Sequence, residues 1–514
     1  MSDSRSSSST TGSVPVFLPA ELRNKICFAL TGKIDQTNSG TDLPRDDYYY
    51  GAHGLERRTL LALALTCSTW RDPALDALWW DMDSIYPLLK LLEPAIVVQP
   101  YLMGRDPDDP LLNVNGLIEL ADLARFEAYS ARVRVIRIEL WHLSYAATGA
   151  LLDAISRPLL PKVERVTWSS RAAEVAPLSY FVHEELRGLD LRVSPNRGSQ
   201  HEDAEYDGMD SGLADLPDRC PGLRWFAASR ALSSVLVKLS SRLQFLAFMP
   251  RLQDFSQVLP GLTNLTHLEL SDFPVPTRVF DESAVTARAT LPQLRSLLVC
   301  CLTLEAAAAM LRALTSPHLS SCHFYHRPHS PGFKWSRKGI HALCVALSRF
   351  NESLTEVIIK HYGVRGERLP FWTIEPLLEL RHLRKLHLVA PYDIFILNDN
   401  AMSRLLSSFP EMRELSLSSS GYSVQSILSM FTLCPWLEIA DFGKVDASAF
   451  AEVHERQGDA PPRLAHLTLL VVRFNNVADI DGLSHFLERM VPHLHEACFP
   501  DGDEDEKTFK LIYH

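Results

Sequence analysis

The sequence predicts an α/β protein, with a small three-helix module at its amino-terminal end followed by an irregular solenoid of about 14 strand-helix units. Three observations lead to this prediction. Apolar residues recur in a six-residue frame from residue 133 onward, helical segments alternate with that frame, and a group of apolar helices precedes it. Hydrophobic residues make up 46% of the 514 residues and charged residues 22%, which is the balance of a folded chain.

Composition and motif order divide the chain into five segments. We expect a disordered serine-rich tail (1–15), the helical module (16–83), bridging helices with a turn-rich linker (84–130), the solenoid (131–500) and an acidic tail (501–514). Within the solenoid range, the stretch HEDAEYDGMD at 201–210 predicts a surface insertion, because it lengthens the spacing between two frames.

The first two helices of the module are predicted from apolar spacing. Residues 17–30, FLPAELRNKICFAL, have Pro19 at a helix start and place Leu22, Ile26 and Leu30 four residues apart. Residues 31–55 are rich in Gly, Asp, Asn and Pro, and predict a loop. Residues 56–66 predict a second helix that is apolar on most sides and therefore mostly buried.

The third helix is predicted to begin with Asp72 as its N-cap and Pro73 as its first residue. Leu75, Leu78 and Trp79 then share one face. Three helices of this length bury too few side chains to be stable separately, so the apolar surface indicates either a packed core or a surface that a second protein covers.

The same residues carry a resemblance to a known family. Leu18-Pro19, an apolar helix, Cys67 with Trp70, and Leu78-Trp79 follow one another in the order found in an F-box, and the resemblance covers roughly residues 16–83. The 31–55 loop is longer than that family's usual connection. The resemblance implies docking on a Skp-type adaptor of SCF ubiquitin ligases through Leu18, Pro19, Leu22, Ile26, Trp70, Leu75, Leu78 and Trp79.

The repeated frame has the form L-x-x-L-x-L with aliphatic or aromatic substitutes. It begins at residues 133, 163, 186, 223, 243, 265, 294, 319, 354, 383, 412, 437, 464 and 494. Helical stretches at 304–315, 339–350, 401–409 and 423–431 lie between frames. One short strand and one helix per unit are typical of a leucine-rich repeat, in which stacked units bury a common core. Asn is missing after the strands, so the repeat is degenerate.

Alternation along each strand predicts which side chains face a partner. In LTHLEL, Leu268 and Leu270 point inward, so His267 and Glu269 point to the concave face. The same positions of other units extend this candidate substrate-binding set, which comprises His267, Glu269, Ser296, Leu298, Lys385, His387, Glu414 and Ser416. Most of these residues are expected to be simply solvated strand positions, because the residues that carry binding are a minority of an interface.

Several functional classes are not supported by the sequence. The net charge of -11, without a run of Lys and Arg, argues against a nucleic-acid partner. Nine scattered cysteines predict reduced, buried thiols, and no apolar stretch reaches the roughly eighteen residues that a membrane span needs. We therefore expect no membrane partner and a cytoplasmic or nuclear location.

The sequence contains no motif for catalysis or cofactor binding. It lacks a phosphate loop, a GxSxG elbow and HExxH, so we expect a protein that is not an enzyme and has no cofactor. Residues 322–329, CHFYHRPH, collect Cys322, His323, His326 and His329, but the repeat frame already assigns Cys322 to the interior, so we expect no metal site.

The favoured hypothesis from the sequence is a substrate-recognition adaptor of an SCF-type cullin-RING ubiquitin ligase. In it the helical module docks the adaptor and the repeats bind an unknown target protein. The alternative is a leucine-rich-repeat interaction scaffold, independent of ubiquitin ligase, whose amino-terminal helices cap the solenoid.

Overall fold

The structure is a computed structural model of the whole chain. It describes residues 18–31, 53–92, 96–99, 111–114, 120–139, 158–170, 176–193, 213–229, 233–249, 257–273, 289–301, 303–326, 336–361, 368–390, 395–417, 419–420, 423–446, 466–467, 469–475, 496–498 and 510–512. The tail 1–15, most of the 31–55 loop, the linker sequence 101–110, the insertion 201–210 and the acidic stretch 501–507 lie outside the described residues.

The chain divides into two compact units, each of which is described separately. Unit 1 comprises Met1–Ser169 with Pro177–Leu186, and unit 2 comprises Ser170–Ala176 with Arg187–His514. The division falls inside the 131–500 range predicted for the repeats, after the second of their strands.

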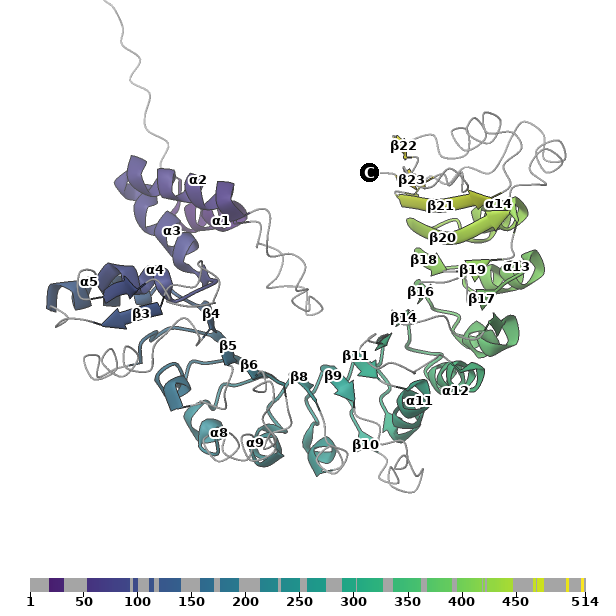
Figure 1. Ribbon diagram of the computed structural model, residues 1–514, viewed down its shortest axis with the longest axis horizontal. Helices are drawn as coiled ribbons and strands as arrows, with labels where there is room; N and C mark the ends of the chain where they lie inside the picture. The colour runs from purple at the N-terminus through teal and green to yellow at the C-terminus, as the bar shows by residue number, and fades with distance from the viewer. Residues whose placement is uncertain are drawn as a thin grey trace, which may run out of the picture. The chain divides into compact units, whose positions relative to one another are not determined.

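Unit 1 begins with three helices, α1 (Ala20–Ala29), α2 (His53–Thr66) and α3 (Ser68–Trp79), and α3 packs against both of the others (Figure 1). Their common core consists of Cys27, Leu60, Ala64, Ala74 and Ala77. Three of these five are small residues, which lets the helix backbones approach closely. The helical module predicted from the sequence is therefore present as three helices.

The predicted start of the third helix is wrong. Helix α3 begins at Ser68 after an extended Cys67, so that Pro73 lies inside the helix. The backbone amides of Trp70 and Arg71 both donate to the carbonyl of Cys67, which starts the helix without Asp72. The carboxylate of Asp72 instead accepts a hydrogen bond from Arg132.

The remainder of unit 1 mixes short helices and strands. It contains β1 (Asp81–Met82), α4 (Tyr86–Leu89), η3 (Lys90–Leu92), β2 (Ile96–Gln99), β3 (Leu111–Val114), α5 (Leu120–Ser130), β4 (Val135–Glu139), β5 (Arg165–Ser170) and η5 (Ala176–Tyr180). Strands β1, β4 and β5 pair in parallel, and β2 pairs with β3 antiparallel. Among the bridging helices predicted within 84–130, α4 and η3 are short, and Leu88, Leu89 and Leu92 on them are buried.

Unit 2 is built on one parallel sheet. Its strands, in spatial order, are β6 (Gly188–Val193), β7 (Trp225–Ala228), β8 (Phe245–Phe248), β9 (His267–Phe273), β11 (Ser296–Cys301), β13 (Ser321–His326), β14 (Glu356–His361), β16 (Lys385–Val389), β18 (Glu414–Leu417), β20 (Ile439–Asp446) and β21 (Leu469–Asn475). Spatial order follows chain order, as parallel strand-helix units require.

Helices and turns of unit 2 connect successive strands. They are α8 (Leu216–Arg219), α9 (Ser233–Leu239), η6 (Leu259–Gly261), α11 (Leu304–Ala313), α12 (Arg337–Ser348), η7 (Phe371–Thr373), η8 (Glu375–Glu379), α13 (Asp399–Ser407) and α14 (Val424–Leu433). Within this unit the strands follow the inner side of an arc and the helices lie on its outer side (Figure 1). Short parallel pairs join β10 (Ala289–Thr290) to β12 (Leu314–Thr315), and β15 (Leu369–Pro370) to β17 (Phe395–Ile396) and β19 (Ser419–Ser420).

The predicted frame describes the core of the sheet from residue 133 to residue 442. The first, fourth and sixth residues of each of these frames are buried, and the most exposed of them, Ala228, is 6% exposed. Leu268 and Leu270 are buried while His267 and Glu269 between them are partly exposed, as alternation requires. Helices α11 to α14 coincide closely with the predicted helical stretches.

The last two frames depart from the prediction. Leu469 pairs with Ile439, so Leu467 takes the position that Leu437 holds in the preceding frame, and the frame begins at 467 and not at 464. The strand predicted after residue 494 is β22 (Glu496–Cys498), which pairs antiparallel with β23 (Lys510–Ile512) and not with the parallel sheet.

Within the described ranges, every helix falls short of the length and apolar character that a membrane crossing requires.

Candidate protein-interaction surfaces

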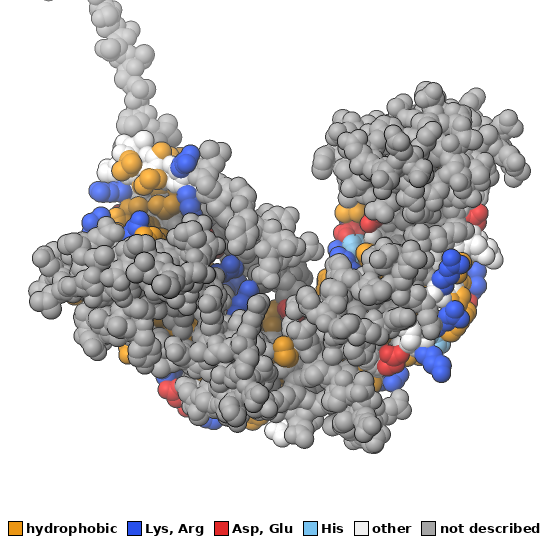
Figure 2. Space-filling model, viewed as in Figure 1, with side chains coloured by type: hydrophobic (Ala, Val, Ile, Leu, Met, Phe, Trp, Pro, Cys, Tyr) orange, Lys and Arg blue, Asp and Glu red, His pale blue; other side chains and the backbone are white. Residues whose placement is uncertain are grey.

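The first surface is a group of exposed apolar side chains on unit 1, which we call the apolar helix face. Leu22 and Ile26 on α1 are 45% and 40% exposed, and Leu61 and Leu65 on α2 are 48% and 79% exposed; Leu18, just before α1, is also exposed. Each pair lies four residues apart and therefore on one side of its helix. Figure 2 shows hydrophobic side chains over these helices with Lys and Arg side chains near them.

The residues predicted to dock an adaptor fall into two groups. Leu18, Pro19, Leu22 and Ile26 are exposed. Trp70, Leu75 and Leu78 are half-buried and pack against the core of the three helices. Trp79 is also half-buried, and its ring lies 4.9 Å from that of Tyr129 on α5. The second group therefore contributes to the stability of unit 1.

Sequence reasoning missed Leu61 and Leu65. The apolar character of α2 on most sides predicted burial, which is correct for Leu60 and Ala64 but wrong for these two leucines. The signal that identifies them is that a helix in a three-helix core buries one side, so an α2 that is apolar on most sides must leave some apolar residues exposed.

Basic side chains accompany the apolar helix face. Lys25, Arg58 and Arg71 are exposed, and among the described residues none of the three forms an ion pair. Arg57 differs, because it donates to Asp83 over 2.6 Å. This face therefore combines apolar side chains with basic side chains that form no ion pair among the described residues.

Arg132 links α3 to the segment that follows α5 through ion pairs with Asp72 and Asp76. Its Nη2 lies 2.8 Å from Asp72 Oδ1, and its Nη1 also donates to Asp76. Asp72 and Asp76 lie four residues apart, so one guanidinium reaches both. Burial alone lowers the pKa of Arg132, but the hydrogen bonds and charges of both aspartates raise it. Arg132 therefore stays charged and holds the end of the module.

Seven of the described cysteines are free thiols, namely Cys27, Cys67, Cys220, Cys300, Cys322, Cys344 and Cys434, and all of them except Cys67 are buried. The prediction of buried thiols is therefore wrong for Cys67, which precedes α3. Its sulfur lies 2.8 Å from the hydroxyl of Thr69, and this hydrogen bond lowers the pKa of Cys67. Desolvation raises the pKa of Cys27, which lies in the core of the module.

The second surface is the strand face of unit 2, formed by the side chains that alternate with the buried positions. The eight predicted substrate-binding residues fall on it in two groups. His267 pairs with Ser296 and Glu269 with Leu298 on β9 and β11. Lys385 pairs with Glu414 and His387 with Ser416 on β16 and β18.

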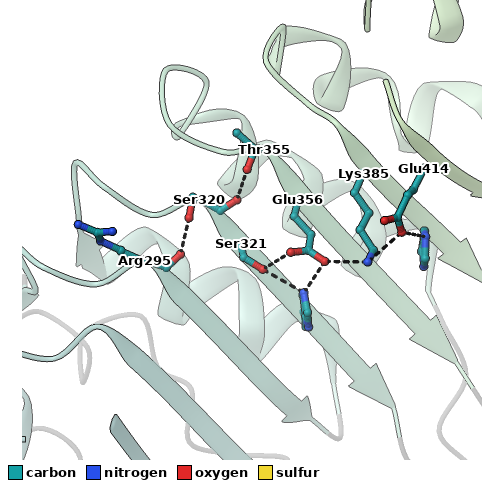
Figure 3. A network of polar contacts seen from close by, with 9 residues as sticks. Arg295, Ser320, Ser321, Thr355, Glu356, Lys385 and Glu414 are labelled. Atoms are coloured by element: carbon teal, nitrogen blue, oxygen red, sulfur yellow. Dashed lines mark hydrogen bonds and ion pairs between the residues drawn. The ribbon is translucent and has the colours of Figure 1, made fainter. Parts of the chain in front are cut away.

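A charged network links neighbouring strands of the second group (Figure 3). Lys385 Nζ lies 3.3 Å from Glu356 Oε1 and 2.9 Å from Glu414 Oε2. His323 Nε2 lies 3.2 Å from Glu356 Oε1, and His387 Nε2 lies 3.5 Å from Glu414 Oε2. Glu356 Oε2 also accepts a hydrogen bond from Ser321 over 2.9 Å. One lysine therefore bridges two carboxylates.

The network holds both carboxylates in their charged form. Burial on its own raises the pKa of Glu356, but the hydrogen bond and charge of His323, together with Lys385 and Ser321, lower it to about 2. His387, whose Nε2 lies 3.5 Å from Glu414 Oε2, is the main cause that lowers the pKa of Glu414 to about 2, with Lys385 acting in the same direction against desolvation. The carboxylates in turn raise the pKa of Lys385 against the effect of burial.

Not every predicted substrate-binding residue is accessible. Ser416 is 5% exposed, and its hydroxyl donates to Asp441 Oδ2 on the next strand over 3.0 Å. Its position on the strand face is as predicted, but its surroundings restrict direct contact with a partner. Ser416 therefore serves to orient Asp441.

The other half of the strand face carries an aromatic row that the sequence analysis did not identify. Trp225 and Phe245 stack with ring centroids 4.8 Å apart at 15°, and the ring of His267 lies 6.4 Å beyond Phe245. His267 Nδ1 bonds the hydroxyl of Thr266. Burial, and then the charge of Arg295, lowers the pKa of His267. Trp225, Phe245 and His267 each occupy the third position of their frame, in three successive frames. This shared position is the sequence signal that could have identified the row.

The residues considered for a metal site are separated by the strand. Cys322 points into the core and is buried, whereas His323 lies on the opposite side with Glu356. His329 lies outside the described residues. In the part of the chain that the structure describes, no group of three or more metal-binding side chains occurs.

The arrangement of both surfaces is suited to binding and orienting other molecules. Neither a comparison with models of protein families nor one with curated proteins gives a match. The functional conclusion therefore depends on the geometry of the two surfaces.

Proposed function

We propose that this protein is a substrate-recognition adaptor of an SCF-type cullin-RING ubiquitin ligase. In this proposal α1–α3 are an F-box that docks a Skp-type adaptor, unit 2 is a leucine-rich-repeat solenoid, and its strand face binds a target protein. The observation that carries the proposal is the apolar helix face, on which Leu22, Ile26, Leu61 and Leu65 all remain exposed.

The energetics of that face favour a partner. Fully burying a leucine or isoleucine side chain contributes about 1.5–3 kcal/mol, and these four side chains retain 40% or more of their surface in water. Single exposed leucines are common on proteins, but two such pairs on helices that share one core resemble the apolar centre of an interface. Covering it with the groove of an adaptor would supply a useful part of a binding free energy.

The proposed mechanism is positional and requires no catalytic residue in this chain. Holding a target protein close to the site of ubiquitin transfer raises its effective concentration there. The two surfaces have separate tasks, because the apolar helix face would bind the ligase and the strand face would bind the target. Ubiquitin transfer itself would be carried out by other subunits.

Capture of a purified Skp-type adaptor by the full-length chain tests the proposal. We expect Leu22→Asp to weaken capture strongly, because the charge would be buried in an apolar interface. Val345→Asp is a matched control, since Val345 is a similarly exposed apolar residue on α12 of unit 2. Equal capture by wild type and a folded Leu22→Asp variant would contradict the assignment.

The second candidate is a repeat scaffold that is independent of ubiquitin ligase. It is favoured by Trp70, Leu75 and Leu78, which were expected to contact an adaptor but pack against the core of the helices. In that case α1–α3 serve mainly to complete unit 1. A wild-type chain that binds target proteins but captures no Skp-type adaptor would support this function over the first.

A further inference from the structure

From β6 to β20, the residue that directly precedes each strand of the large sheet belongs to a continuous row along one edge of that sheet. The amide of Arg224 donates to the carbonyl of Arg187 over 2.9 Å, and that of Gln244 donates to Arg224 over 2.8 Å. The amide of Thr266 donates to Gln244, and that of Arg295 donates to Thr266, in the same way. We call Arg187, Arg224, Gln244, Thr266 and Arg295 the arginine rim.

Within the described part of the chain, the positive charge of the arginine rim has no counter-ion. Arg187, Arg224 and Arg295 are exposed, and among the described residues none of them forms an ion pair. Gln244 and Thr266, which separate Arg224 from Arg295, are uncharged. Figure 3 shows the side chain of Arg295 extending away from Ser320, which bonds its carbonyl.

The same row continues beyond the rim, but there its arginines are neutralised. Arg384 lies 2.9 Å from Glu411, and Arg413 lies 3.0 Å from Glu438. The uncompensated charge is therefore confined to the part of the row between β6 and β11. Arg384 and Arg413 directly precede their strands, as the rim arginines do, so they serve as an internal comparison.

Unpaired arginines on adjacent strands indicate an anionic partner. Arg187 and Arg224 lie on hydrogen-bonded neighbours, where backbones are about 4.8 Å apart, and like charges at that spacing repel each other. A guanidinium presents a planar fork of donors that fits a carboxylate with two parallel hydrogen bonds. A segment that carries carboxylates would reduce the repulsion between Arg187 and Arg224 and would accept hydrogen bonds from both guanidinium groups.

Apolar surface lies beside the rim. Trp225, which follows Arg224 in the chain, is half-buried and stacks on Phe245, which follows Gln244. A bound segment could therefore place acidic side chains on the rim and an apolar side chain against the exposed part of Trp225. A nucleic acid fits less well, because Glu356 and Glu414 on the same strand face would repel further phosphates.

We propose that the arginine rim binds an acidic, extended segment of the target protein, with Asp or Glu side chains paired to Arg187, Arg224 and Arg295. This inference rests on the proposed role of the strand face in target recognition. Four strand spacings separate β6 from β11, which amounts to roughly 19 Å. An extended segment of about six residues spans that distance.

The test measures binding of a fluorescent peptide of about ten residues, with alternating Glu and Gly, to the full-length chain by fluorescence anisotropy. The Gln-Gly peptide of equal length is the control ligand. We expect the acidic peptide alone to bind, with an affinity that falls as salt is raised. Each of Arg187→Gln, Arg224→Gln and Arg295→Gln should weaken binding about two- to fivefold, and the triple variant more than about tenfold.

Arg413→Gln is the matched control, because it removes the same charge from the same row at a position already paired with Glu438. It should leave peptide affinity within about twofold of wild type. Equal binding of both peptides, or unchanged affinity of the triple variant, would overturn the proposal. Tighter binding of a single-stranded RNA than of the acidic peptide would also overturn it.

Capture of the Skp-type adaptor by the same protein samples separates this inference from the proposed function. The triple variant should capture the adaptor as wild type does, because the rim lies in unit 2 and the apolar helix face in unit 1. If the wild-type chain binds the acidic peptide but does not capture the adaptor, the proposed ligase role is wrong and the acidic-segment site is still supported.

Discussion

Leu22 and Leu60 are equivalent in chemistry and opposite in surroundings, since Leu22 is 45% exposed on α1 whereas Leu60 is 1% exposed in the core of the same three helices. We predict that Leu22→Ala changes the free energy of unfolding by less than about 0.5 kcal/mol and that Leu60→Ala lowers it by about 2–4 kcal/mol. Urea denaturation followed by tryptophan fluorescence measures both. A large loss in Leu22→Ala would mean that another part of the chain covers this side chain.

Leu78 is predicted to behave differently from Leu22, although both belong to the set expected to dock an adaptor. Leu78 packs against the helical core, so Leu78→Asp would bring a charge into contact with apolar groups. We predict a stability loss of about 2–4 kcal/mol and a proportional loss of adaptor capture. Stability like that of wild type, combined with weak capture, would assign Leu78 a direct contact with the adaptor.

The charged network predicts a specific dependence of stability on acid. Glu356 and Glu414 have their pKa lowered to about 2, so both bind protons less readily in the folded state than in the unfolded state. Their stabilisation is present above the ordinary carboxyl pKa and is lost as pH falls from about 4.5 to about 2. We predict that the double variant Glu356→Gln/Glu414→Gln has a shallower loss of stability in this window than wild type.

The contribution of the two carboxylates is about 1–2 kcal/mol once solvent screening is taken into account, because their side chains remain partly exposed. Chemical denaturation at a series of pH values measures it. The double variant Glu411→Gln/Glu438→Gln is the control, since its carboxylates form exposed pairs with Arg384 and Arg413. Parallel pH profiles of wild type and Glu356→Gln/Glu414→Gln would show that the network contributes nothing.

Lys385 holds the network together, since its ammonium group lies between the two carboxylates. Lys385→Met keeps most of the apolar stem but leaves two negative charges facing each other, and we predict a loss of about 1–3 kcal/mol at pH 7. Adding Glu356→Gln to that variant should restore part of the loss. Additive effects of the two substitutions, measured as a double-mutant cycle, would be inconsistent with direct coupling.

Asp399, the first residue of α13, connects this helix to the N-terminus of α14. Its carboxylate accepts hydrogen bonds from the amide and hydroxyl of Ser423, the N-cap of α14, and from the hydroxyl of Ser426. We predict that Asp399→Ala costs about 2–3 kcal/mol, because it leaves several donors unpaired, whereas Ser429→Ala on the exposed side of α14 costs less than about 0.5 kcal/mol. Thermal unfolding of the two variants tests the difference.

The sequence predicted the buried positions of the strands better than it predicted where individual strands and helices begin. Frames such as Leu383, Leu386 and Leu388 are recognisable because burial on one side of a strand imposes a strict alternation. At residues 464–472 two frames overlap, with Leu467 common to both, and only pairing with β20 decides between them. The start of α3 was mispredicted because Asp72-Pro73 resembles a helix start, whereas the extended Cys67 begins the helix.

The candidate surfaces were only partly predictable for a physical reason. Strand positions such as His267 and Lys385 follow from alternation within one frame. The link between Lys385 and Glu356 joins successive strands. Whether Arg224 has an ion-pair partner among the described residues likewise depends on the neighbouring strands and loops. Exposure of Leu61 and Leu65 likewise depends on which helices pack together, which local spacing does not specify.

The most direct measurement of the central claim is the heat capacity change on binding a purified Skp-type adaptor, obtained by isothermal titration calorimetry at several temperatures. Burial of the apolar helix face predicts a negative heat capacity change. The combined variant Leu22→Ala/Leu65→Ala should bind at least about tenfold more weakly, with a smaller heat capacity change and unchanged stability. No binding by the folded wild-type chain, or an affinity and heat capacity change that this variant leaves unaltered, would contradict the account.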